Sequence, residues 1–249
     1  MFHAIYRNVY AYLCYIQAVK IFNDFAQLPI SDQELKEEQL TRQRHYFPQT
    51  KPLPGVPTLL ADLASTKSTD EPVYIALATS SHRGNYKLKT DHLTELFSVF
   101  PEPNKVLGDD PRIGKGRGKP LPDIYLLALE TINVDLRSKG KTEIKPEECL
   151  VFEDAVPGVE AGRRAGMQVA WCPHPGLLGA FKGREEEVLA GATGSHKEEE
   201  KTEAEKEAEE LQAPRLQNSG TPGKIGDGFG QLYSTLEDFP YAKYGIRIP

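Results

Sequence analysis

Three short apolar runs constrain the fold of this chain more than any other feature. They cover residues 73–78, 149–152 and 168–172. Runs of this length that are almost entirely apolar are typical of strands covered on both faces, as in a parallel sheet. Helical stretches separate the runs along the chain. The alternation predicts an α/β protein, with a Rossmann-like parallel sheet and helices on both faces.

The beginning of the chain differs from the part that contains these runs. Residues 1–50 carry scattered apolar side chains among charged ones, which indicates a small helical unit. Ser31 and Glu34, three residues apart, form a capping box that predicts a helix start. Prolines at positions 48, 52 and 54 then interrupt the chain. We therefore expect a helical unit over 1–50 and the α/β unit over 51–182.

A Glu-rich segment follows over residues 183–224. Between residues 184 and 210 there are eleven glutamates against four lysines or arginines, so the rest of the chain is nearly neutral. Such a segment cannot bury enough apolar surface to offset the entropy of ordering. It predicts a disordered insertion whose protein partner, if it has one, is unknown. Apolar residues return over 225–249, which we expect to pack back on the α/β unit.

Composition excludes several classes of protein. A formal net charge of -6 argues against a general nucleic-acid binder. The three cysteines lie far apart and show neither a disulfide framework nor zinc spacing, so we expect a reducing, cytoplasmic setting. Residues 5–22 are apolar but interrupted by charges. They have neither the pattern of a signal peptide nor the roughly 20 apolar residues that a membrane span needs.

Polar side chains follow two of the apolar runs, where a parallel sheet collects its reactive groups. Thr79, Ser80 and Ser81 come after the first run and suit a phosphate, although an ordinary helix cap explains them equally. Glu153 and Asp154 come after the second. Two adjacent acids there are costly unless a cation is bound, and oxygen ligands suit Mg²⁺. The alternative is that Asp154 caps a helix while Glu153 faces solvent.

A lysine in a proline-rich turn is the third candidate. Lys119 stands between Gly118 and Pro120, just before a helical stretch. A lysine fixed in this way neutralises a phosphate and the carboxylate that attacks it. The alternative is a solvated basic loop, since other basic residues lie between 112 and 117. A nucleotide P-loop is excluded, because Gly116 stands where serine or threonine must bind magnesium.

In this order the three motifs resemble those of the haloacid dehalogenase (HAD) superfamily. The resemblance is to the branch with a helical cap, whose members are β-phosphoglucomutase-like and pseudouridine-5′-phosphatase-like. Residues 77–81, 118–125 and 151–154 resemble its second, third and fourth motifs. The resemblance implies a HAD-like core with a partial helical cap over 1–50. It also implies a Mg²⁺-dependent phosphatase acting on a small phosphorylated metabolite, such as a sugar or nucleoside phosphate.

The same resemblance implies a role for each candidate residue. Thr79 and Lys119 would act in catalysis. The phosphate-binding residues would be Thr79, Ser80, Ser81 and Lys119. The metal ligands would be Glu153 and Asp154, with Mg²⁺ as the cofactor. Neither nucleic acid nor a membrane is expected as a partner.

The family's nucleophile motif has no counterpart in the sequence. HAD chemistry begins with Asp-x-Asp at the end of the first core strand, where one aspartate attacks phosphorus and the other transfers protons. None of the aspartates stands in this context. Because that strand lies in the middle of the family's sheet, its neighbours are expected to have unpaired edges. We therefore expect a truncated, weakly active or inactive phosphatase. A non-catalytic phosphate- or protein-binding remnant and a phosphomutase are the alternatives.

Overall fold

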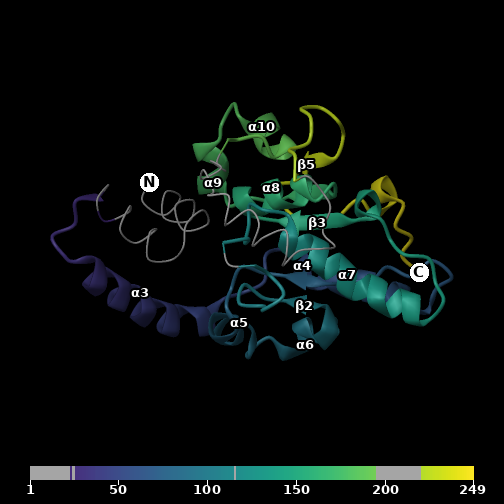
Figure 1. Ribbon diagram of the computed structural model, residues 1–249, viewed down its shortest axis with the longest axis horizontal. Helices are drawn as coiled ribbons and strands as arrows, with labels where there is room; N and C mark the ends of the chain where they lie inside the picture. The colour runs from purple at the N-terminus through teal and green to yellow at the C-terminus, as the bar shows by residue number, and fades with distance from the viewer. Residues whose placement is uncertain (1–22, 24–25, 115, 195–219) are drawn as a thin grey trace, which may run out of the picture.

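The computed structural model describes residues 23, 26–114, 116–194 and 220–249. This part of the chain forms parallel strands flanked by helices, which confirms the expected α/β class (Figure 1). None of its helices has the length and apolar character needed to cross a bilayer. The apolar stretch 5–22, Lys115 in the basic loop and most of the Glu-rich segment, 195–219, lie outside the described residues.

The strands form two parallel sheets. Strand β1 (Leu77–Ala78) pairs with β2 (Lys105–Val106). Strand β3 (Leu150–Glu153) pairs with β4 (Gln168–Trp171), which pairs in turn with β5 (Gly230–Leu232). The orders are β1-β2 and β3-β4-β5. Within the described part of the chain, β1 and β3 therefore each keep one edge without a strand partner.

The first apolar run forms a shorter strand than expected. Only Leu77–Ala78 of residues 73–78 are in a strand, whereas the other two runs became β3 and β4. A strand persists only where a neighbour supplies hydrogen bonds, and β2 supplies two residues. In place of a strand on the free side of β1, the Ala78 carbonyl accepts a hydrogen bond of 3.2 Å from Lys119 Nζ.

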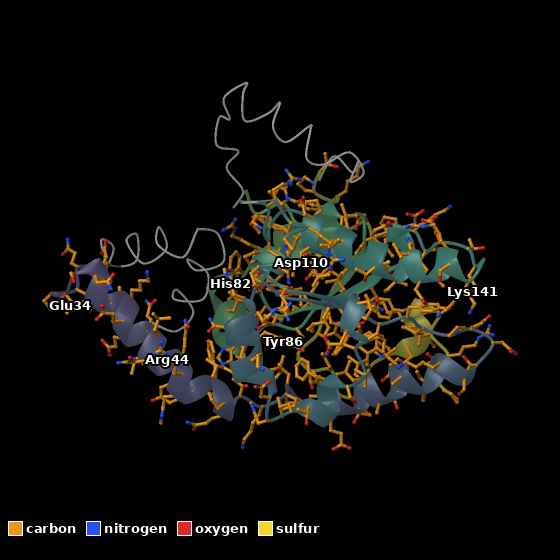
Figure 2. The ribbon with its side chains drawn as sticks, turned by 60° about the horizontal axis from the view of Figure 1, so that its bottom comes forward. Glu34, Arg44, His82, Tyr86, Asp110 and Lys141 are labelled. Carbon is orange, nitrogen blue, oxygen red and sulfur yellow. The ribbon has the colours of Figure 1, made fainter. Side chains whose placement is uncertain are left out.

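Helices surround the sheets, and the capping box predicted at Ser31 and Glu34 is confirmed. The α-helices are α3 (Asp32–Tyr46), α4 (Val56–Ser65), α5 (Arg83–Thr90), α6 (Thr94–Phe97), α7 (Asp123–Ser138), α8 (Val156–Arg164), α9 (Pro175–Ala180) and α10 (Glu185–Ala190). Short 3-10 helices are η1 (Phe47–Gln49), η2 (Thr66–Ser68), η3 (Glu102–Asn104), η4 (Pro146–Glu148) and η5 (Tyr241–Tyr244). Helix α3 extends outward, with Glu34 and Arg44 along it (Figure 2).

The core has two apolar clusters, one on each face of β4. Val169 and Trp171 pack in the cluster that contains α7 and α8. Ala170 packs in the second cluster, with α4 and the C-terminal segment. Because successive side chains of a strand point to opposite faces, this alternation shows that helices cover both faces of the sheet. The central strand β4 is the best covered, with Val169, Ala170 and Trp171 buried.

The folded part extends further into the Glu-rich segment than expected. Helix α10 lies within 183–224, and its Val188, Leu189 and Ala190 are buried. The expectation of disorder is wrong here, because this short apolar face packs against α8 and β5. Beyond residue 225, the chain forms β5 and buries Leu236 and Phe239 in the second cluster.

Candidate active site

Lys119 joins the ends of the two sheets. Its ammonium donates to the carbonyl of Ala78, the last residue of β1, at 3.2 Å. It also forms a hydrogen-bonded ion pair with Oε1 of Glu153, the last residue of β3. The two side chains are only 10% and 9% exposed. The structure thus brings together a cation and an acid that are 34 residues apart in the chain.

The turn that carries Lys119 is anchored on helix α7. Arg117 donates two hydrogen bonds to the buried carboxylate of Asp123, at 2.5 and 2.9 Å from Nε and Nη2. Asp123 is the first residue of α7, where a negative charge is favourable. Within the turn, Leu121 lies between Pro120 and Pro122. A solvated basic loop is therefore wrong for Arg117 and Lys119, which are both partly buried and paired.

Tyr125 completes this site. Its hydroxyl donates to Glu153 Oε1, the same oxygen that Lys119 contacts, and Lys119 Nζ lies 4.7 Å from the centre of its ring. Burial and the negative charge of Glu153 raise the pKa of Tyr125 well above its ordinary value, so the phenol stays a neutral donor. Sequence reasoning gave this residue no role. The available signal was an aromatic residue with a polar tip, six positions after Lys119 on a buried helix.

Helix α8 lies close against the other side of Glu153. Oε2 of Glu153 accepts a hydrogen bond of 3.3 Å from the backbone N–H of Ala155. A Cβ added to Gly158, in the first turn of α8, would lie 2.0 Å from Glu153 Cδ. Glycine is thus required for this approach. The N-cap of α8 is Ala155 and Glu153 is largely buried, so the alternative of a capping Asp154 beside a solvated Glu153 is wrong.

The hydroxyl residues occupy the turn after β1. Thr79 Oγ1 accepts a hydrogen bond from the N–H of Ser81 at 3.1 Å, and Lys89 Nζ donates to Ser81 Oγ at 3.0 Å. Ser80 is exposed. The alternative of an ordinary serine or threonine cap is wrong, because the N-cap of α5 is His82. At the start of α5, the Asp109 carboxylate accepts a hydrogen bond from the backbone N–H of Arg83, the first helical residue, at 3.1 Å.

The acids at the end of β3 fit a magnesium ion in an open site. Mg²⁺ usually takes one or two protein carboxylates and completes its shell with water and phosphate. Asp154 is exposed, and Glu153 accepts two hydrogen bonds at Oε1 and one at Oε2. The described residues contain no group of three or more His, Cys, Asp or Glu that could enclose a metal. Two adjacent acids at a strand end match the small number of protein ligands that such an ion needs.

Fold and site together define a class of protein. Lys119 joins the ends of β1 and β3, which the hydroxyl residues 79–81 and the second acid, Asp154, directly follow in the chain. In open parallel sheets, ligands bind at this carboxyl end of the strands. The protein is of the α/β type, with a largely buried lysine–glutamate pair at the carboxyl ends of its strands.

Comparison with known proteins identifies the family. The model of the family described as haloacid dehalogenase-like hydrolase matches residues 10–166, and the chain belongs to this family. The resemblance inferred from the three motifs is confirmed. The residue roles that it implies stay predictions.

Several curated phosphatases are similar to the chain. It is 42% identical over 165 residues to a probable pseudouridine-5′-phosphatase of Saccharomyces cerevisiae, covering 66% of this chain and 65% of that protein. It is 32% identical over 164 residues to (DL)-glycerol-3-phosphatase 2 of Arabidopsis thaliana, covering 65% and 62%. The chain spans 60% to 65% of the length of the first curated relatives it matches. A crystal structure of a HAD family hydrolase from Deinococcus radiodurans with bound phosphate and sodium has 25% identity and a TM-score of 0.45, covering 66% of this chain and 62% of that one.

Proposed function

We propose that this chain forms the phosphate- and Mg²⁺-binding part of a HAD-type phosphatase that acts on a small phosphomonoester. The observation that carries the proposal is the position of Lys119, which links the ends of β1 and β3 beside the two acids. The names of relatives, a pseudouridine-5′-phosphatase and a glycerol-3-phosphatase, support a sugar or nucleoside phosphate, or a similarly small ester, as the ligand.

Each residue has a distinct task in this proposal. The ammonium of Lys119 attracts the phosphate dianion and holds it near the end of β1. Thr79, Ser80 and Ser81 supply hydroxyl and backbone N–H donors to its oxygens. Glu153 and Asp154 would hold the Mg²⁺, whose chemistry is to neutralise charge on the phosphoryl group. Burial of the Lys119 and Glu153 side chains keeps water from screening these interactions.

Hydrolysis by the HAD mechanism also requires an attacking carboxylate beside Lys119. Among the described residues, the acid that contacts Lys119 is Glu153, and Tyr125 and the N–H of Ala155 hold it in place. A carboxylate restrained in this way is not poised to attack phosphorus. We propose that the chain as given is weakly active or inactive. The lack of an Asp-x-Asp motif favours non-catalytic phosphate binding as the second candidate function, and a phosphomutase stays a prediction.

Binding and turnover should be measured on the same purified chain. We expect inorganic phosphate with Mg²⁺ to raise the midpoint of thermal unfolding. Lys119→Met should abolish the shift. Lys139→Met is the matched control, since it removes a different lysine that pairs with an acid, at 2.6 Å, on the surface of α7. Absence of any shift in the natural chain, with phosphate and Mg²⁺ at millimolar concentration, would overturn the proposal.

Turnover of small esters then separates the two candidate functions. Pseudouridine 5′-phosphate and glycerol 3-phosphate are suitable substrates, with released phosphate as the readout. Turnover that requires Mg²⁺ and Lys119 would identify an active phosphatase. Binding without turnover would identify the non-catalytic alternative. A cytoplasmic location, and a partner for the Glu-rich segment, remain proposals that need localisation and interaction experiments.

A further inference from the structure

Tyr125 holds two charged groups of the site at once. Its hydroxyl donates to Glu153 Oε1 while its ring lies under the Lys119 ammonium, 4.7 Å away. The residue is 7% exposed and lies in the first turn of α7, which packs against β1 and β2. Its position is therefore set by the core and does not depend on a bound ligand.

The hydrogen bonds distribute unequally over the two oxygens of Glu153. Oε1 accepts from both Lys119 and Tyr125, which occupies the two lone pairs of a carboxylate oxygen. From the described residues, Oε2 accepts only the long 3.3 Å bond from the N–H of Ala155. Oε2 is therefore the carboxylate oxygen with a lone pair left for a further ligand. If the phenol were absent, the carboxylate could rotate and present either oxygen.

We propose that Tyr125 is a positioning residue that fixes the Glu153 carboxylate so that Oε2, and not Oε1, serves as a magnesium ligand. This inference rests on the proposed function of Glu153 and Asp154 in binding Mg²⁺. Tyr125 would act on the metal through Glu153, to which its hydroxyl donates. The ring has a second task, because it keeps the Lys119 ammonium between Ala78 and Glu153 by a cation–π contact.

The test is Mg²⁺ affinity, measured by calorimetry in the presence of inorganic phosphate. Tyr125→Phe keeps the ring and removes the hydroxyl, and removing a group that orients a metal ligand weakens binding by about 10-fold or more. Tyr241→Phe is the matched control: the Tyr241 hydroxyl donates to Asp62 at 2.7 Å, in a different part of the molecule. Its Mg²⁺ affinity should equal that of the natural chain.

A double variant separates positioning from a general loss of stability. In the Glu153→Gln background, Tyr125→Phe should change Mg²⁺ affinity no further, because the carboxylate it orients is gone. Equal losses in both backgrounds would overturn the inference. If Tyr125→Phe does not fold, Glu153→Asp is the second variant that tests the inference. It withdraws the carboxylate from the phenol and leaves α7 unchanged. Undiminished affinity in that variant would also overturn it.

The outcomes distinguish this inference from the proposed function. If the natural chain binds Mg²⁺ and Tyr125→Phe binds it equally well, only the role of Tyr125 fails. If the natural chain binds neither Mg²⁺ nor phosphate, the proposed function fails, and the role of Tyr125 fails with it. A selective loss in Tyr125→Phe, with Tyr241→Phe unaffected, supports both.

Discussion

Replacing Gly158 with alanine tests the close packing of α8 against the site. The added Cβ would lie 2.0 Å from Glu153 Cδ and 2.1 and 2.3 Å from its two oxygens. Non-bonded atoms do not approach so closely, so one of the two groups must move. The Glu153 carboxylate is the end of a side chain and can move. Gly158 is part of a helix whose buried residues fix it in the core. We therefore expect the Glu153 carboxylate to swing away from its partners.

The structure sets the size of this effect. Displacement breaks the ion pair with Lys119 and the hydrogen bond from Tyr125, in a place where the paired side chains are 10% and 9% exposed. Removing one partner of a buried pair costs about 3–5 kcal/mol, whereas a displaced carboxylate regains some solvation. Alanine also gains about 0.5–1 kcal/mol over glycine in a helix. We therefore expect Gly158→Ala to lower the free energy of unfolding by about 1–3 kcal/mol.

The assay is urea unfolding followed by circular dichroism. Gly84→Ala is the matched control, since Gly84 also lies in the first turn of a helix, α5, and its added Cβ meets no atom within 4 Å. This control should be neutral or slightly more stable. Phosphate and Mg²⁺ affinity should fall about 10-fold in Gly158→Ala alone. If both variants had equal stability and equal affinity, the packing argument would be refuted.

Three further predictions concern ionisable groups outside the site. Burial alone would raise the pKa of Asp227, but backbone N–H groups and the ion pair with Arg163 hold it below the ordinary 3.8. The stabilisation of the folded state by ionised Asp227 is complete above about pH 4 and is lost as the pH falls further. Asp227→Asn should therefore lower the free energy of unfolding in urea by about 1–2 kcal/mol at pH 7 and by less at pH 3. A cost that did not depend on pH would contradict this. Burial raises the pKa of Glu160 above 4.5, so its charged form is disfavoured in the folded protein. Glu160→Gln, which keeps an acceptor for Thr193, should therefore add about 1 kcal/mol to the free energy of unfolding at pH 8 and little near pH 4, and equal effects at both pH values would exclude the explanation. Burial raises the pKa of Cys149 to about 12, so about one thiol in 10,000 is ionised at pH 8. Iodoacetamide should modify it about 1,000-fold more slowly than free cysteine, as peptide mass spectrometry can measure, and rapid labelling would show that the thiol is not shielded.

Local patterns in the sequence were enough to predict the elements that local interactions stabilise. The capping box at Ser31 and Glu34 starts α3, because both of its hydrogen bonds join residues three apart. The second and third apolar runs form β3 and β4, since a continuous apolar segment can be buried on both faces. The three motifs also resembled those of the family to which the chain belongs.

Features that depend on partners distant in the chain were decided by the tertiary structure alone. The first run kept only Leu77–Ala78 in a strand, because strand length depends on the neighbour that supplies hydrogen bonds. Residues 185–190 form a helix, because α8 and β5 cover their apolar side chains. The Tyr125 hydroxyl and the Lys119 ammonium both donate to Oε1 of Glu153, which lies 28 residues after Tyr125 and 34 residues after Lys119. No local pattern encodes such a contact, since packing of α7 against the strands sets the distances over which charges and hydrogen bonds act.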